Sequence, residues 1–278
     1  MKTSTAPFSS KLAGWHLPRL SDRAVGLITV VVLLALWELF SRLGYLNTYH
    51  FPPPSKLAAT LWALAVEGFP KGITVWQHIA ATVWRILLGY IMAIVLAIPL
   101  GLVIGTTYVL DKATSPIITF ARSIATISLL PLAVAWFGVG ELARVILIFY
   151  GCFWIILTNV IEGVKHVDVR LINAGKMLGA SRQQLFFRVI LPATLPRIFA
   201  GMKVALGIAF MVIVAVEMIG TIQGLGALIM EARTFYRSDA AMVGMIFIAL
   251  FGFFLSKILD WVERTLLPWA PDLEEMER

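Results

Sequence analysis

Charge and cysteine are both scarce in this chain of 278 residues. Charged side chains make up 14% of the sequence, whereas a soluble domain usually carries about 25%. A water-soluble fold has no use for the apolar content of 59%. The single cysteine, Cys152, lies inside an apolar run, which excludes an internal disulfide and a cysteine cluster for metal. The composition therefore indicates an integral membrane protein.

Sequence patterns typical of enzymes are also missing. The sequence contains no G-x-x-x-x-G-K-[ST] phosphate loop and no paired carboxylates or histidine clusters at the ends of apolar runs. The four histidines, His16, His50, His78 and His166, are scattered in segments expected to be loops. We therefore predict no catalytic residue, no metal site and no cofactor bound by this chain, and a membrane enzyme is disfavoured.

Long apolar runs, by contrast, are abundant. A transmembrane helix requires about 20 mostly apolar residues, and the segments that fit are 25–43, 86–110, 115–137, 144–161, 198–219 and 240–256. The expected fold is thus an all-α membrane protein with about six transmembrane helices. Gly101 and Gly105 have the G-x-x-x-G spacing that permits a close helix contact, within the chain or in a dimer.

The link between the first two apolar runs contains a proline cluster, Phe51 to Ser55. Proline lacks the backbone N–H and clashes with the preceding turn, so this cluster cannot be a helix interior. Ser55 is expected to cap a short helix running through Trp62 and Val66. That helix is too short and too polar to span a membrane, and we expect it to lie on the outer surface.

The distribution of positive charge predicts the orientation. The N-terminal tail carries Lys2, Lys11, Arg19 and Arg23, and the segment 162–203 carries a larger basic excess. With six spans these two segments and the C-terminus share one side, which the excess of Lys and Arg assigns to the cytoplasm. The net charge of +7 then reflects the membrane, and no nucleic-acid partner is expected.

The basic segment 162–197 has the pattern of a helix-turn-helix. Residues 167–178 have helical spacing, and Gly179 supplies the break that a helix C-terminus prefers. Ser181 and Gln184 form a capping box, in which each side chain can bond the backbone N–H of the other. The hairpin is too polar to enter lipid.

A second helix follows the capping box and is expected to end at Pro192 and Pro196, before the fifth span. Spacing alone leaves two interpretations of this hairpin open. It is either an amphipathic pair resting at the membrane interface, or a docking element for a cytoplasmic protein.

The same segment resembles a known family. Residues 171–181, LINAGKMLGAS, followed by Ile190, Leu191 and Pro192, resemble the coupling loop of ABC-importer permeases, whose pattern is E-A-A, then G, then I-x-L-P. The wider chain is similar to the nitrate/sulfonate/taurine-type branch. The segments that match are 51–55, 130–132, 136–138, 140–141, 207–210, 217–220, 224–226 and 233–239.

The resemblance implies a type I ABC importer permease with a cytoplasmic N-terminal tail (1–24), a transmembrane permease domain (25–262) and a cytoplasmic C-terminal tail (263–278). Two copies of the chain would form the pathway in a bacterial inner membrane. An ABC ATP-binding subunit, in two copies, would bind ATP and Mg²⁺, and an extracytoplasmic binding protein would deliver a nitrate-, sulfonate- or taurine-like solute. The alternative is a stand-alone secondary transporter or channel, against which the spans offer few ionisable groups for a proton relay.

Residues of the hairpin carry the implied contact with the ATP-binding subunit. They are Asn173, Ala174, Gly175, Lys176, Gly179, Ala180, Ser181, Leu191 and Pro192. Asn173 stands where the family has Glu, and Gly175 stands where it has the second Ala. Both lower helix propensity, Gly by about 1 kcal/mol relative to Ala, so these two departures bear on the strength of the contact with the ATP-binding subunit and not on its existence.

Three residues inside apolar runs are candidates for the pathway or its gate: Arg122, Pro131 and Glu217. Glu217 could serve gating or packing, contact substrate or mark an exposed helix end. Arg122 could snorkel or form an anion site. The family also has prolines where this chain has Ser123 and Ala125, so a less kinked third span is expected.

Overall fold

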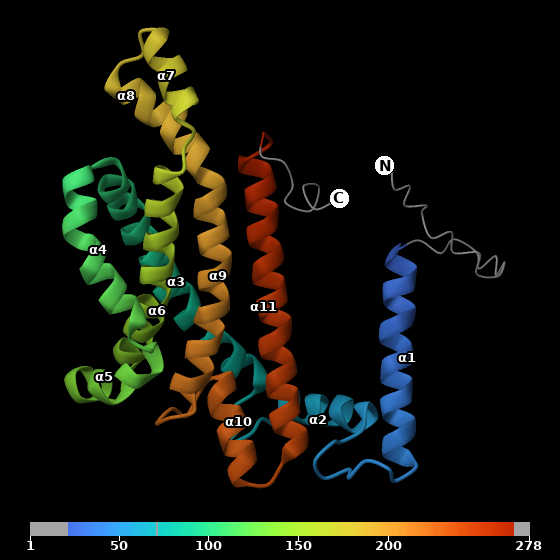
Figure 1. Cartoon of the computed structure of the whole chain (residues 1–278). Coiled ribbons are helices and arrows are strands. Elements are labelled where there is room, and N and C mark those ends of the chain that lie inside the picture. The colour runs from blue at the N-terminus through green and yellow to red at the C-terminus, as the bar shows by residue number, and fades with distance from the viewer. Residues whose placement is uncertain (1–21, 71, 270–278) are drawn as a thin grey trace, which may run out of the picture. The chain divides into compact units, whose positions relative to one another are not determined.

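The computed structural model describes residues 22–70 and 72–269, and Figure 1 shows helices joined by turns and loops. The all-α fold expected from the sequence is confirmed. The chain divides into two compact parts, Met1–Ser55 and Lys56–Arg278. Residues 1–21 of the expected N-terminal tail, and 270–278 of the expected C-terminal tail, lie outside the described residues.

Helix α1 (Asp22–Arg42) forms the first part's membrane span. Its window Val25–Arg42 is apolar enough to cross a membrane, and its apolar side chains are largely exposed, as lipid contact requires. The expected span 25–43 is thereby confirmed as a helix. Near its end, Glu38 pairs with Arg42 at 2.6 Å and accepts hydrogen bonds from the Ser55 hydroxyl at 2.8 Å and the Ser55 N–H at 3.1 Å.

The short helix expected after the prolines is α2 (Pro54–Val66). Ser55 does not cap it, because the helix begins at Pro54 and the Ser55 hydroxyl is bonded to Glu38. The fixed φ of proline suits the first helical turn, where no intrahelical N–H bond is needed. Further along, Thr60 is buried and its hydroxyl donates to Asp239 at 2.8 Å, which fastens α2 to the start of α11 (Ser238–Leu266).

Three long helices form the core of the second part. They are α3 (Val75–Thr106), α6 (Glu141–Lys165) and α9 (Leu191–Glu217), and their buried apolar residues make one continuous cluster. Gly101 and Gly105 of α3 lie against Val160 and Val164 of α6, where an added Cβ would come within 2.8 Å of the valine side chains. The G-x-x-x-G spacing thus serves a close contact within one chain.

Helix α3 starts well before the expected boundary of residue 86. Its first turns contain His78, Thr82 and Arg85, which are buried and hydrogen-bonded instead of exposed in a loop. The span is expected to start after Arg85 because an unpaired charge is too costly inside a membrane-spanning helix. His78, expected in a loop, is therefore a buried helical residue.

The third expected span, 115–137, is not a single rod. Helix α4 (Tyr108–Ser123) is followed by the short 3₁₀ turn η1 (Thr126–Leu129) and by α5 (Leu130–Phe137), and the axis bends by 82° between them. The expectation of a less kinked span is wrong. Ile124 and Ala125 adopt extended conformations, and the Ser123 hydroxyl bonds the Thr119 carbonyl, so the helix ends without a proline.

The second helix of the hairpin does not stop at Pro192 and Pro196 as expected. Helix α8 (Arg182–Leu185), a π-helical turn η2 (Phe186–Ile190) and α9 follow one another without a break. Pro192 lies in the first turn of α9, and the π turn before it supplies the altered hydrogen bonding that lets the ring fit. The resulting apolar helix, Arg182–Glu217, is 36 residues long.

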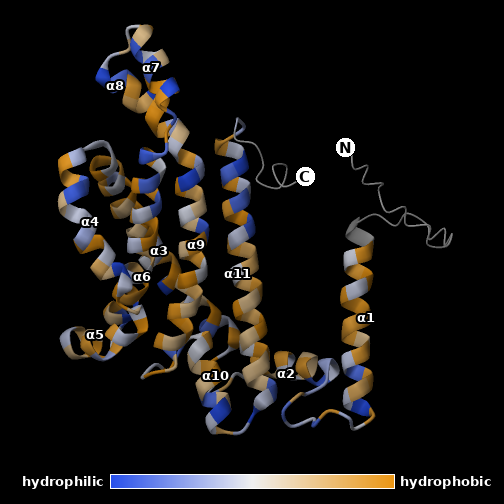
Figure 2. Ribbon diagram, in the orientation of Figure 1, coloured by the Kyte–Doolittle hydropathy of each residue, from blue (hydrophilic) through white to orange (hydrophobic). Residues whose placement is uncertain are grey.

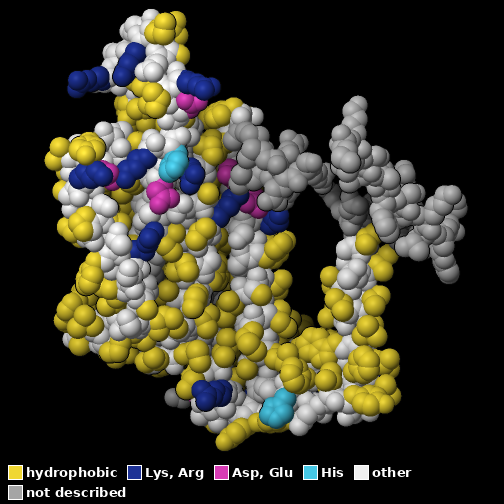
Figure 3. All heavy atoms as spheres, in the orientation of Figure 1, with side chains coloured by type: hydrophobic (Ala, Val, Ile, Leu, Met, Phe, Trp, Pro, Cys, Tyr) yellow, Lys and Arg dark blue, Asp and Glu magenta, His cyan; other side chains and the backbone are white. Residues whose placement is uncertain are grey.

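Within the described residues, five helices are long and apolar enough to cross a membrane, or six if the bent pair is one span. In the second part, Figure 2 shows apolar residues along the long helices and polar residues gathered on α7 (Val169–Met177) and α8. Lys and Arg concentrate toward that end, above a broad apolar band (Figure 3). A band of this kind is what a bilayer-embedded bundle presents.

Candidate functional site

The hairpin α7–α8 is built as the sequence predicts. Asp168 caps α7 by accepting the N–H of Arg170 at 2.8 Å, and Gly179 turns the chain with φ of +77°. Around that glycine the Ala180 N–H bonds the Gly175 carbonyl and the Gly179 N–H bonds the Lys176 carbonyl, both at 3.0 Å. This is a Schellman motif, whose left-handed residue is favoured as glycine.

The second helix of the hairpin starts with the expected capping box. The Gln184 N–H donates to the Ser181 hydroxyl at 3.3 Å, and the Ser181 N–H donates to the Gln184 side chain at 2.8 Å. Leu185 is buried against Gly175, where an added Cβ would come within 2.8 Å of the leucine. Glycine in place of the family's alanine thus lets the two helices approach closely, so the hairpin is a packed unit.

The tip of the hairpin exposes large apolar side chains. Met177 is 89% exposed and Leu178 is 88% exposed, and Phe187 of the π turn is also exposed. The remaining predicted contact residues Asn173, Ala174, Lys176 and Ser181 are exposed, whereas Ala180, Leu191 and Pro192 are partly buried. The tip of the hairpin thus combines exposed apolar side chains with the exposed basic residue Lys176.

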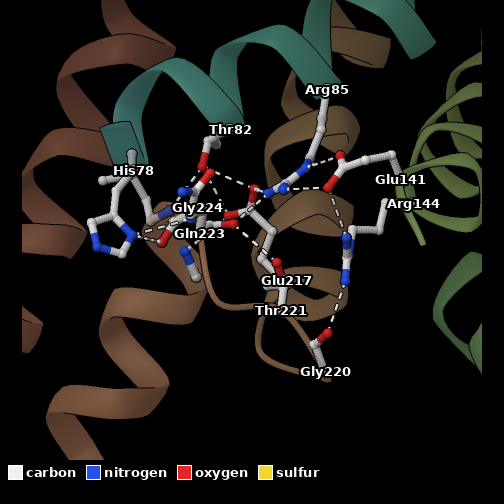
Figure 4. A network of polar contacts seen from close by, with 12 residues as sticks. His78, Thr82, Arg85, Glu141, Arg144, Glu217, Gly220, Thr221, Gln223 and Gly224 are labelled. Carbon is white, nitrogen blue, oxygen red and sulfur yellow. Dashed lines mark hydrogen bonds and ion pairs between the residues drawn. The ribbon is translucent and has the colours of Figure 1, made fainter. Parts of the chain in front are cut away.

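At the opposite end of the bundle lies a network of charged groups, drawn in Figure 4, in which Arg85, Arg144 and Glu217 are buried and the side chain of Glu141 is 61% exposed. It is called the buried network below. Arg85 of α3 makes a two-pronged contact with Glu141 of α6, from Nε at 2.6 Å and Nη2 at 2.7 Å. Its Nη1 bonds the carboxylate of Glu217, the last residue of α9, at 2.6 Å. Glu217 is 1% exposed. Arg144 bonds Glu141 at 3.0 Å, so two arginines balance two carboxylates.

The same groups fasten the loop between α9 and α10 (Leu225–Thr234). Arg144 donates to the Gly220 carbonyl at 2.9 Å, and Arg85 donates to the Gln223 carbonyl at 2.7 Å. Glu217 accepts the Gly226 N–H at 3.0 Å. Buried charges are stable only when they are paired and hydrogen-bonded. The buried network therefore needs the loop's backbone groups as hydrogen-bond partners, and the loop is held in place by the network.

Two further side chains of α3 complete the network. Thr82 donates to Glu217 at 2.8 Å and accepts the Leu225 N–H at 2.8 Å. The Nδ1 of His78 lies 2.8 Å from the carbonyl oxygen of Gly224, which adopts φ of +140°. A side chain on Gly224 would collide with the Glu217 carboxylate, so this position requires glycine.

A comparison with protein families decides which family this fold and hairpin represent. Residues 86–270 match the model of the binding-protein-dependent transport system inner membrane component. The chain belongs to this family. It is therefore a multi-pass permease component of an ABC transporter, and ATP is bound by a partner ATPase.

Individual relatives agree with this assignment. The permease is 34% identical over 261 residues to the taurine transport system permease protein of Escherichia coli (strain K12), covering 94% of each chain. It is 32% identical over 248 residues to the bicarbonate transport system permease protein of Synechocystis sp. (strain ATCC 27184 / PCC 6803 / Kazusa), covering 86% of this chain and 87% of the relative.

The fold also matches a solved structure, a chain of the MetNI methionine ABC transporter in an inward facing conformation. The TM-score is 0.59 with 19% sequence identity, over 69% of this chain and 97% of that chain. Type I permease architecture is thus confirmed.

The three residues expected in the pathway or gate of the permease do not come together. Glu217 joins the buried network, and an exposed helix end is excluded for it. Arg122 is exposed in the last turn of α4, and Pro131 is exposed in the first turn of α5.

Sequence reasoning missed the partners of Glu217. In the sequence, Arg85 and Arg144 stand next to or at the start of the apolar runs 86–110 and 144–161, and Glu141 lies in one of the segments that match the family. The available signal was that all of these charges sit at the ends of spans that must meet on one side of the membrane.

Proposed function

We propose that this permease forms the translocation pathway of an ATP-driven importer for a small anionic solute of the taurine, sulfonate or nitrate kind. An extracytoplasmic binding protein delivers the solute to the side that holds the buried network. The observation that carries this proposal is the packed hairpin with its exposed Met177 and Leu178, which suits attachment to a separate ATPase. The relative named for taurine transport supports the solute class.

Coupling follows from how the hairpin joins the bundle. One continuous helix, Arg182–Glu217, starts in the hairpin and ends in the buried network. A rigid helix transmits displacement along its length, so movement of the ATP-binding subunit at Met177 and Leu178 reaches the Glu217 end. There the Arg85 and Arg144 contacts hold the loop to α10 closed until that movement pulls on it.

Both termini of the permease are proposed to be cytoplasmic. The basic segment 162–203 and the hairpin then face the cytoplasm, which is the side where ATP is available. A reporter fused after Arg278 should be active only in its cytoplasmic form. A periplasmic signal would overturn this orientation and place the hairpin out of reach of the ATP-binding subunit.

The working transporter is proposed to contain two copies of the permease and two copies of the ATP-binding subunit. One copy supplies only one wall of a pathway, and two-fold symmetry is the commonest closed assembly. Native mass spectrometry of the transporter, purified after co-expression with its ATP-binding subunit, should show two of each. A complex with one permease and two ATPases would contradict the proposal.

A further inference from the structure

Helix α4 exposes a polar face that bilayer contact does not explain. Ser115, Thr119, Arg122 and Ser123 follow the spacing i, i+4, i+7, i+8, which places them on one side of a helix. All four are exposed. Ile117 and Phe120 are exposed on another side of the same helix, so α4 presents an apolar face suited to lipid beside a polar one that is not.

Contacts with α6 set the depth of this face. At one end of α4, Asp111 pairs with Lys165, the last residue of α6, at 2.5 Å. Near its other end, the Ala121 carbonyl accepts the Tyr150 hydroxyl at 2.8 Å. Tyr150 precedes Lys165 by 15 residues in α6, or about 22 Å of helix. With the Lys165 end of α6 placed at one face of a hydrocarbon layer about 30 Å thick, Arg122, next to Ala121, lies inside the layer, about 8 Å from the opposite face.

A charge at that depth requires water or a partner. An arginine that faces lipid costs about 2.5 kcal/mol or more at the centre of a spanning helix and less toward its ends. Among the described residues, Arg122 makes no ion pair with any carboxylate. This sets it apart from Arg85 and Arg144, whose charges are balanced within the chain.

The hydroxyls of Thr119 and Ser123 are already hydrogen-bonded within α4. Thr119 donates to the Ser115 carbonyl at 2.9 Å, and Ser123 donates to the Thr119 carbonyl at 2.8 Å. Such hydroxyls are satisfied in a dry membrane and can rotate toward a passing polar solute. The polar face therefore combines one permanent positive charge with adaptable hydrogen-bonding groups.

We propose that the polar face of α4, defined by Ser115, Thr119, Arg122 and Ser123, lines the translocation pathway, and that Arg122 binds the anionic group of the solute in transit. This inference rests on the proposed importer function and assigns the residue that selects for a sulfonate or another small anion. The relatives named for taurine and bicarbonate transport handle solutes that share such a group. An arginine suits it because the guanidinium stays charged and can bond two oxygens at once.

Cysteine accessibility tests the lining without depending on transport. The native cysteine is first removed by Cys152→Ala, and a single cysteine is introduced by Ser115→Cys or Thr119→Cys. The assembled transporter is then treated with the anionic reagent 2-sulfonatoethyl methanethiosulfonate or with its cationic trimethylammonium analogue. Both positions should react, and Ile117→Cys on the apolar face should not. Arg122→Gln should lower the rate with the sulfonate at Thr119→Cys at least tenfold relative to the cationic reagent. Unreactive polar-face cysteines, or a ratio unchanged by Arg122→Gln, would overturn the proposal.

Transport then distinguishes a pathway residue from a structural one. In proteoliposomes with the ATP-binding subunit and binding protein, Arg122→Gln should reduce taurine uptake at least tenfold. ATP hydrolysis stimulated by the binding protein, and co-purification of the ATP-binding subunit with the permease, should persist. Arg122→Lys should recover much of the uptake, and Lys257→Gln, an exposed site on α11, should match the unmodified permease. Loss of the ATP-binding subunit during purification of Arg122→Gln would mean that Arg122 has a structural role in the assembly, which overturns a solute contact. Absence of uptake by the unmodified permease would instead refute the importer function, leaving the accessibility result to decide the lining.

Discussion

Replacing Gly179 by valine is expected to abolish solute uptake and to prevent co-purification of the ATP-binding subunit, while the permease still inserts in the membrane. Gly179 has φ of +77°, a conformation that is costly for a β-branched residue. A Cβ at this position would meet no heavy atom within 4 Å, so the defect arises from the backbone alone. The turn would open and the Met177–Leu178 tip would move away from the ATPase.

Two milder variants calibrate this effect. Gly179→Asn should keep most activity, because asparagine tolerates the left-handed conformation far better than valine. Ser181→Ala removes a helix cap worth about 1 kcal/mol and should give a partial loss of both uptake and co-purification. Normal uptake and normal co-purification in Gly179→Val would refute the docking role, and the hairpin would then be a helix pair resting on the membrane surface.

Removing Arg85 from the Arg85–Glu217 pair is expected to destabilise the permease strongly. The Arg85 side chain is 4% exposed and that of Glu217 is 0% exposed, so Arg85→Ala leaves an unpaired buried carboxylate. Breaking such a pair costs about 3–5 kcal/mol. Thermal unfolding in detergent, followed by tryptophan fluorescence, should show a large drop in the midpoint for Arg85→Ala and a smaller drop for Glu217→Ala, because Arg85 stays paired with Glu141 in that variant.

A surface ion pair provides the matched control. Lys257 and Asp260 lie 3.7 Å apart, and the lysine side chain is 62% exposed, so Lys257→Ala should change stability by less than about 1 kcal/mol. The double variant Arg85→Met with Glu217→Leu should recover part of the lost stability, since it removes both charges together. A midpoint in Arg85→Ala equal to that of Lys257→Ala would show that the network does not hold the loop to α10.

The hairpin could be predicted from the sequence because its determinants are local. Gly179, Ser181 and Gln184 fix the turn and the next helix start through bonds that span only a few residues. The predicted end of the second hairpin helix at Pro192 and Pro196 was wrong, because the effect of a proline depends on the backbone geometry of the residues before it. Pro192 follows a π turn, and no pattern in the sequence announces one.

The buried network could not be predicted because its members are far apart in the chain. Arg85 and Glu141 are separated by 56 positions, and Thr82 and Glu217 by 135. Each charge taken alone looks like the polar limit of a span, and only the packing of α3, α6 and α9 brings them together. The bend after Ser123 also could not be predicted, because the extended backbone of Ile124 and Ala125 produces it without a proline at either position 123 or 125.

Reconstitution tests the central claim most directly. The permease and its ATP-binding subunit are placed in liposomes that enclose ATP and Mg²⁺, and the binding protein with radiolabelled taurine is added outside. Accumulation of taurine should require ATP, the ATP-binding subunit and the binding protein together, and should vanish with Gly179→Val. Uptake by the permease alone, without ATP or binding protein and driven by an ion or solute gradient, would contradict the account and identify a stand-alone transporter.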